Sequence, residues 1–444
     1  MRTDVDGEHR RQGTAGRRAP EVIGLGGNGF FNASGRRPDT TAAVVGGATG
    51  PGTVHPARRV TQNGDEMAEA DHDWPAEPGA RLAVFCAPAR YVQGRHATAQ
   101  LGSVLTAMGL DGPVLIVASA RVESMLGAAW ARTLGAVGIH YAMHHFGGEC
   151  SQPEIDAGVA AARAMGATTV LGAGGGKALD ASRAVAAACG VAAVNCPTLA
   201  SSDAPCSALS VVYQPDGTFD RDLFYPRNPD LVLVDTEIVA KAPARFLVSG
   251  MGDALATWFE ARTVIEARKP NQLQGATTLT AGALARLCYD TLLEDGPAAL
   301  AAVRARSVTP ALERLVEANT LLSGLGFESG GLAIAHSVHN GLTTARETHA
   351  LLHGEKVAFG LLVQLVVEGR PQAEFDEVVR FNRTVGLPTT LADLGLAVTD
   401  EDALAAVAER AVAPGETAHN EPFPVTAAAV LDGIRAADGF ARSV

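Results

Sequence analysis

The chain has 444 residues, of which 47% are hydrophobic and 19% are charged, which is ample material for two folded domains. Its formal net charge of −12 argues against a nucleic-acid partner held through phosphate contacts. No apolar run has membrane-spanning length, and six cysteines without a C-x-x-C pair indicate reduced thiols in a cytoplasmic protein rather than a disulfide framework.

Residues 1–78 show no apolar periodicity and are rich in Gly, Arg, Thr and Pro. Burial in such a segment cannot offset the entropy cost of ordering it. We expect either a disordered tail or a misassigned extension, with Met67 as an alternative start. Residues 24–29 match G-x-G-x-x-G, but they lack the preceding strand and following helix of a dinucleotide-binding fingerprint, so we reject that match.

Residues 79–243 alternate short apolar runs with helical patterns. A helix is expected up to about residue 136, and another over 154–165. The alternation predicts an α/β domain with a doubly wound parallel sheet and helices on both faces. The expected strands cover residues 82–85, 114–118, 139–146, 169–171, 191–194, 211–213 and 231–234.

Strand patterns stop after Pro243, and residues 244–444 are predicted to form an all-α domain. The boundary between the two domains is expected near residues 243–249. The expected helices cover residues 250–267, 277–293, 312–324, 333–340, 355–368 and 375–385.

A glycine run at residues 172–180 follows an expected strand and opens an expected helix. Glycines there let the backbone approach a diphosphate, and the helix N-terminus offers unpaired N–H groups. The run is not a P-loop, because Leu171 stands where that motif needs glycine. A structural tight turn is the alternative, but Lys177 and Asp180 favour nucleotide binding. The expected cofactor-binding residues of the run are Gly174, Gly175, Gly176, Lys177 and Asp180.

Four of the twelve histidines fall within residues 331–359. Any single histidine of this kind is more often a hydrogen-bonded residue of the core or of a helix end. The cluster nevertheless indicates a metal site if a carboxylate joins it. The four are His336, His339, His349 and His353.

Asp253 is the best-placed carboxylate, since it lies in the apolar start of an expected helix at residues 250–258. Capping of that helix is the alternative role. Together with His336 and His353 it would provide two nitrogen ligands and one oxygen ligand, with a coordination position left open. That arrangement is typical of a catalytic zinc site.

Several long segments closely resemble the bacterial glycerol dehydrogenases, which belong to the iron-containing alcohol dehydrogenase superfamily although they use zinc. The resemblance runs from about residue 80 to the C-terminus. It implies oxidation of glycerol to dihydroxyacetone, NAD and Zn²⁺ as cofactors, and a ring-like homo-oligomer, commonly an octamer. The segments are residues 147–156, 172–180, 197–213, 250–262, 317–343 and 353–360.

The resemblance also implies roles for individual residues. Asp253, His336 and His353 match the metal ligands, and Asp203 matches a residue near the substrate and the nicotinamide. His339 is expected to join a proton path or to support the ligands, while His349 receives no role. The positions that match the lining of the NAD site are Gly176, Lys177, Asp180, Thr198, Ser201, Ser207, Leu209 and Tyr213.

Two positions differ from patterns of the superfamily. Thr257 stands where the iron-using members have a histidine one turn after the aspartate, which favours three ligands and zinc. Ser119 stands where an aspartate usually binds the adenosine ribose, with Arg121 two residues on. Because an acidic residue there repels a 2′-phosphate, we expect increased tolerance of NADP.

Three other functions are compatible with parts of the sequence. Another vicinal diol such as 1,2-propanediol could replace glycerol as the substrate. A lyase of the dehydroquinate synthase type would share the fold, NAD and zinc, but only four lysines and an aspartate at position 253 argue against it. A binding protein without catalysis is disfavoured by the intact metal and cofactor motifs.

Overall fold

The computed structural model describes residues 82–215 and 217–444, so the expectations for residues 1–78 lie outside the described part of the chain. The described residues all belong to one unit, Met67–Val444. None of the helices described in it combines the length and the apolar character that a membrane span needs.

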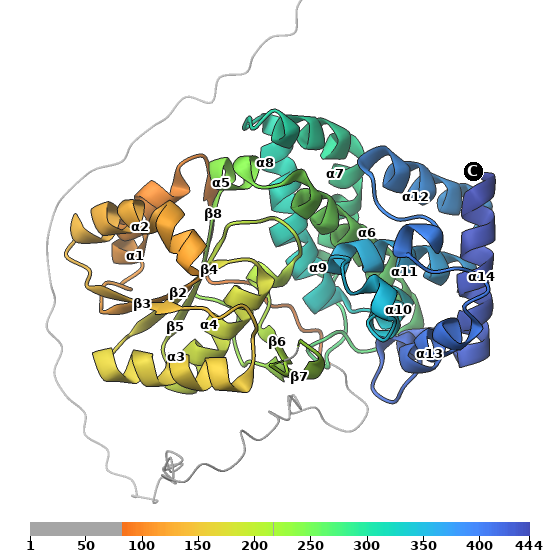
Figure 1. The fold of residues 1–444 in the computed structure, drawn as a ribbon, viewed down its shortest axis with the longest axis horizontal. Coiled ribbons are helices and arrows are strands. Elements are labelled where there is room, and N and C mark those ends of the chain that lie inside the picture. Colours follow the sequence, from red (N-terminus) through yellow and green to blue (C-terminus); the bar gives the residue numbers. More distant parts are fainter. Residues whose placement is uncertain (1–81, 216) are drawn as a thin grey trace, which may run out of the picture. The chain divides into compact units, whose positions relative to one another are not determined.

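The apolar runs of the first half form a six-stranded parallel sheet in the described residues (Figure 1). In spatial order the strands are β1 (Tyr91–Gly94), β8 (Leu231–Asp235), β5 (Ala192–Pro197), β4 (Thr169–Gly174), β2 (Val114–Ala118) and β3 (Tyr141–His145). Strands β2, β4 and β8 are buried at every position, as expected for a parallel sheet that is covered on both faces.

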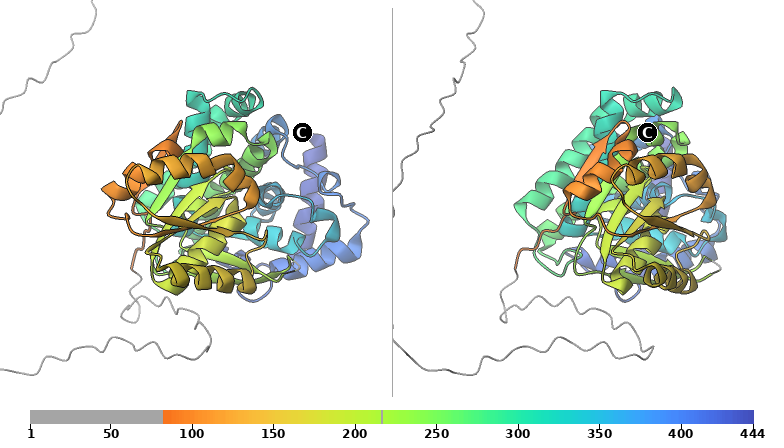
Figure 2. Two further views of the ribbon diagram at one scale, coloured as in Figure 1. Left: turned by 60° about the vertical axis from the view of Figure 1, so that its left-hand side comes forward. Right: turned by 90° about the vertical axis from the view of Figure 1, so that its left-hand side faces the viewer.

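Helices cover both faces of this sheet, as the views in Figure 2 show. Ile116 of β2 packs in a core cluster with Trp130 of α2, whereas its neighbour Leu115 packs with Ile155 of α3 and Val185 of α4. Neighbouring residues point to opposite faces because side chains alternate along a strand. The predicted doubly wound α/β arrangement is therefore confirmed. The helices are α1 (Leu101–Ala107), α2 (Ala120–Gly135), α3 (Gln152–Met165), α4 (Gly176–Cys189) and α5 (Thr236–Lys241).

Two strand predictions were wrong in detail. Residues 82–85 contain only an isolated bridge from Ala83 to Ala276, and the first strand is instead β1. The strand predicted at 211–213 exists as β6 (Leu209–Tyr213), but it pairs antiparallel with β7 (Phe219–Phe224) outside the main sheet.

From Ala244 onward the described chain is helical around one large hydrophobic core cluster, which matches the predicted all-α part. We propose residues 243–244 as the boundary between the two domains. The predicted helix over 312–324 is α8 and α9 joined by a π-helical turn, Ala318–Leu322. The helices are α6 (Ala244–Ala267), α7 (Leu279–Arg304), α8 (Pro310–Glu317), α9 (Ser323–Gly330), α10 (Ile334–Leu342), α11 (His353–Val367), α12 (Gln372–Val385), α13 (Glu401–Ala411) and α14 (Ala427–Ser443).

Helices α6, α10 and α11 lie side by side, and glycines allow their close approach (Figure 1). A Cβ atom at Gly354 would lie 1.8 Å from the carbonyl oxygen of Ser249 on α6. A Cβ atom at Gly360 would lie 2.3 Å from the carbonyl oxygen of Ala335 on α10. Glycine is thus required at both positions of α11, and the three helices can present side chains to one common point.

Candidate metal centre and active site

That common point is formed by Asp253 of α6, His336 of α10 and His353 of α11. Their candidate ligand atoms all lie within 4.8 Å of one another. Asp253 Oδ1 is 3.0 Å from Nε2 of His353 and 3.4 Å from Nε2 of His336. The structure therefore brings together the three residues predicted as metal ligands. Two imidazole nitrogens and one carboxylate oxygen are a donor set that fits a catalytic zinc ion.

Asp253 does not cap a helix, because α6 begins nine residues earlier at Ala244 and the aspartate is fully buried. Capping is therefore wrong as the alternative role. Burial acts to raise the pKa of Asp253, but His353 and His336 outweigh it and hold the pKa well below its usual range. The carboxylate is thus charged and faces the two rings.

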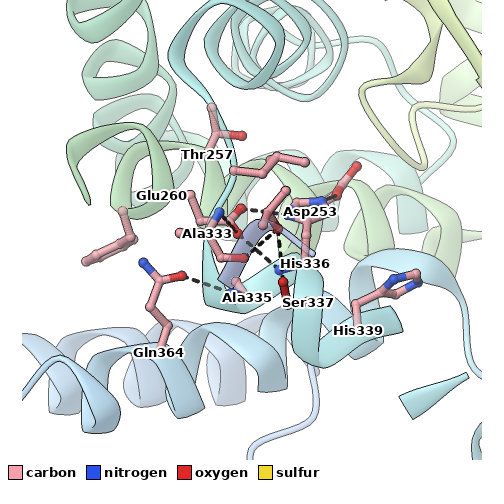
Figure 3. A network of polar contacts seen from close by, with 12 residues as sticks. Asp253, Thr257, Glu260, Ala333, Ala335, His336, Ser337, His339 and Gln364 are labelled. Carbon is pink, nitrogen blue, oxygen red and sulfur yellow. Dashed lines mark hydrogen bonds and ion pairs between the residues drawn. The ribbon is translucent and has the colours of Figure 1, made fainter. Parts of the chain in front are cut away.

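Glu260 orients His336, although no sequence pattern singles it out. Its Oε2 lies 2.6 Å from His336 Nδ1, while its Oε1 accepts the backbone N–H groups of Ala333 and His336 at 2.8 and 3.0 Å. Figure 3 shows Glu260 and Asp253, both from α6, facing His336. Burial disfavours the charged ring, but Glu260 and Asp253 together raise the pKa of His336. A metal ion would replace the proton on Nε2.

His353 is oriented by a chain of polar groups on its other side. Its Nδ1 lies 2.9 Å from Nε2 of His339, whose Nδ1 lies 3.1 Å from Oδ1 of Asn340. Asn340 in turn donates to Glu416 at 3.0 Å. Burial, followed by the charges of His353 and Lys356, lowers the pKa of His339. A neutral His339 that donates to Asn340 leaves its Nε2 free to accept the Nδ1 proton of His353, so a metal ion can bind at Nε2 of His353.

Asp203 lies beside the cluster, in the loop after β5. Its backbone N–H donates to Asp253 Oδ2 at 3.1 Å, and its side chain accepts the hydroxyl of Ser323 at 3.0 Å. Burial and the charge of Asp253 raise the pKa of Asp203.

Two other residues that the sequence singled out lie outside the candidate ligand set. Thr257 contacts the Ser323 hydroxyl at 2.8 Å. His349 is exposed and contacts the carbonyl oxygen of Thr343, away from the cluster.

The predicted glycine turn joins β4 to α4. Gly174 has a φ of +157°, and a Cβ atom there would lie 2.9 Å from Cβ of Ala178. The N-cap, Gly175, has no side chain to satisfy the first N–H groups of α4. Ser119 after β2 and Thr198 after β5 lie at the same carboxyl edge of the sheet. This edge is where α/β proteins bind dinucleotides, so these residues fit the cofactor.

The other predicted cofactor residues differ in accessibility. Lys177 is half-exposed, and its Nζ lies 2.6 Å from Oε2 of Glu149 and 4.7 Å from the centre of the Tyr213 ring.

Asp180 instead points into the protein and forms a buried ion pair with Arg183. Burial raises its pKa to about 6 against the effect of Arg183. Ser201 and Leu209 are half-buried, and Ser207 is buried with its hydroxyl on the carbonyl of Ala204. The cofactor roles of all these residues remain predictions.

Comparison with known proteins assigns the chain to a family. The model of the iron-containing alcohol dehydrogenases matches residues 88–236. A glycerol dehydrogenase from Thermotoga maritima is 52% identical over 361 residues, which cover 80% of this chain and 96% of that protein. The chain belongs to the glycerol dehydrogenase family of iron-containing alcohol dehydrogenases.

Two further proteins are similar to this chain. The crystal structure of glycerol dehydrogenase from Schizosaccharomyces pombe superposes with a TM-score of 0.78 at 37% identity, covering 82% of this chain and 92% of that one. A glycolaldehyde reductase from Halobacterium salinarum is 47% identical over 361 residues, which cover 81% of this chain and 98% of that protein.

Proposed function

We propose that the chain is a zinc-dependent glycerol dehydrogenase that oxidises glycerol to dihydroxyacetone and passes the hydride to NAD. The observation that carries the proposal is the convergence of Asp253, His336 and His353 beside Asp203 in a member of this family. When bound, zinc lowers the pKa of an alcohol group, and the nicotinamide accepts the hydride.

The residues of the chain would supply position and charge. Asp253, His336 and His353 would hold the zinc ion, with Glu260 and His339 fixing the orientation of the two rings. Asp203 would orient the substrate hydroxyls, because its loop is tied to Asp253 and its side chain to Ser323. His339 supports His353 in this proposal, and the proton path stays its alternative role.

The dinucleotide would lie along the carboxyl edge of the sheet. Its diphosphate would bind at Gly174, Gly175 and Gly176, where the N–H groups of α4 are uncapped. Ser119 and Arg121 would meet the adenosine ribose. Neither is acidic, so tolerance of NADP remains part of the proposal.

Two other substrates, 1,2-propanediol and glycolaldehyde, fit the same site, whereas a lyase reaction does not fit the relatives. Another vicinal diol such as 1,2-propanediol would meet the same metal and the same Asp203. Glycolaldehyde is kept because a relative that is 47% identical is named for its reduction. The lyase of the dehydroquinate synthase type is not retained, because the sequence relatives cited above are a dehydrogenase and a reductase.

A substrate panel tests the proposal. NADH formation would be followed with glycerol and 1,2-propanediol, and NADH consumption with dihydroxyacetone and glycolaldehyde. The expected result is the highest kcat/KM for the glycerol and dihydroxyacetone pair, with loss of activity in Asp203→Ala. A higher kcat/KM for glycolaldehyde would replace glycerol in the proposal, and no activity on any of the four would overturn it.

We also propose that the protein is a cytoplasmic homo-oligomer, and that it is an octamer, as the resemblance to the bacterial glycerol dehydrogenases implies. All six cysteines are free, which suits a reducing compartment. Leu279 and Leu287 of α7 are 95% and 50% exposed, and such residues suit a contact with another copy. Light scattering of the purified protein would give the number of copies.

A further inference from the structure

Lys356 is a nearly buried lysine whose side chain has no partner in the part of the chain that the structure describes. It lies one turn after His353 on α11 and is 9% exposed. Its ammonium has no hydrogen bond or ion pair with any described residue. The other three lysines each have an acceptor: Lys177 has Glu149, Lys241 has Glu237 and Lys269 has the carbonyl of His419.

The charges around Lys356 compensate it only in part, through Glu355, which acts to raise the pKa of Lys356. Its neighbour Glu355 already binds Arg245 through both carboxylate oxygens, at 2.6 and 2.7 Å, and also accepts the N–H of Leu352. After burial, the charge of Lys177 is the main influence that lowers the pKa of Lys356. The ammonium is not among the polar atoms sealed from solvent without a partner, so an anionic ligand can reach it and pair with it.

Lys356 is within electrostatic reach of two functional regions. The glycine turn adjoins the loop of Asp203, because a Cβ atom at Gly176 would lie 3.8 Å from Cβ of Ala204, and that loop donates the backbone N–H of Asp203 to Asp253 beside His353. The charge of Lys177, at the N-terminal end of α4, also reaches Lys356 and lowers its pKa. The charge of Lys356 therefore adds to the partial positive charge of the uncapped α4 N-terminus, where Lys177 is paired with Glu149. A field of this kind fits a group that carries more than one negative charge.

We propose that Lys356 binds the diphosphate of the dinucleotide, together with Lys177 and the glycine turn before α4. The inference rests on the proposed function, and it makes α11 a shared element. This helix carries the candidate metal ligand His353 and, one turn on, a contact to the cofactor that is held by the sheet. The cofactor and the metal are thus positioned against each other by one rigid helix.

The test measures binding, separately from catalysis, in the full-length protein. NADH affinity would be measured by fluorescence titration, and ADP-ribose and adenosine by competition with NADH. The variants are Lys356→Met, which keeps the apolar stem, and Lys356→Arg, which keeps the charge. Lys241→Met is the control, because that exposed lysine pairs with Glu237 away from the site.

We expect Lys356→Met to weaken NADH and ADP-ribose by about tenfold or more, as for loss of a charge-assisted hydrogen bond. Adenosine affinity should not change, and Lys356→Arg should retain most of the affinity. Unchanged ADP-ribose affinity in Lys356→Met, with or without a higher KM for glycerol, would overturn the inference. Failure of the unmodified protein to bind NADH would instead remove the proposed function. Thermal melting would show that each variant is folded.

Discussion

Glu260 Oε2 lies 2.6 Å from Nδ1 of His336, and the two residues come from different helices. The carboxylate therefore decides which nitrogen of the ring faces Asp253. Removal of such a partner typically costs 10–100-fold in metal affinity. We expect Glu260→Gln to weaken zinc binding about tenfold or more, measured by competition with a chromophoric chelator.

Glu266→Gln is the matched control for this prediction, since Glu266 is on the same helix but pairs with Arg370 at the surface. Its zinc affinity should equal that of the unmodified protein. If Glu260→Gln bound zinc as tightly as the unmodified protein, the contact between Glu260 and His336 would not contribute to zinc affinity.

His339 is expected to affect zinc binding only through His353. His339→Ala removes the acceptor 2.9 Å from Nδ1 of His353, so zinc affinity should fall, but less than in His353→Ala. The same chelator competition measures both variants. If His339→Ala kept full zinc affinity and lost turnover, the proton-path role would be favoured over support.

Glu421 is 2% exposed, and neither of its carboxylate oxygens has a hydrogen-bond partner among the described residues. Burial and the charges of Glu368 and Glu260 raise its pKa to about 9, from an ordinary value of 4.5. The folded state therefore holds a proton that the unfolded state releases above pH 4.5, and stability falls as pH rises between these values. The maximum loss is about 1.4 kcal/mol per pH unit.

Glutamine imitates the neutral acid, so Glu421→Gln should raise the melting temperature, and the gain should be larger at pH 8 than at pH 5. Glu409→Gln on the exposed side of α13 is the control and should change little at either pH. A gain that is the same at both pH values would mean that Glu421 does not titrate in this range.

Ser119 is expected to set the choice between NAD and NADP. Its side chain caps α2 by accepting the N–H of Val122, and it brings no negative charge to the edge of the sheet. Ser119→Asp should lower kcat/KM with NADP by about tenfold or more and leave NAD nearly unchanged, since a carboxylate repels the 2′-phosphate. A strong preference of the unmodified protein for NAD would contradict this prediction.

The sequence predicted the fold well wherever buried strands gave continuous apolar runs, as in β2 and β8. It missed β1, because Tyr-Val-Gln-Gly carries little apolar signal and its place depends on pairing with β8. It assigned β6 to the main sheet, because a strand pattern does not reveal the partner strand. The apolar pattern did not reveal the start of α6 at Ala244, so Asp253 fell at an expected helix start where a cap would lie.

The histidine cluster and the family resemblance predicted the three candidate ligands. Of the residues that contact these ligands, His339 was predicted but Glu260 was not. Glu260 follows Asp253 by seven residues, or two helical turns, so the spacing placed both on one face of α6. The sequence still gave no reason to prefer it over a surface glutamate. The cofactor role of Asp180 stays a prediction. Its i,i+3 spacing to Arg183 on α4 permits their ion pair, but the burial of that pair depends on tertiary packing.

The most direct test is metal replacement. The protein would be freed of metal with a chelator, then given zinc or iron(II), with bound metal and glycerol-dependent NADH formation measured together. We predict that activity is lost on removal and restored by one zinc ion per chain, and that Asp253→Asn neither binds zinc nor recovers. Activity that persists without metal, or that returns only with iron(II), would contradict the zinc site formed by Asp253, His336 and His353.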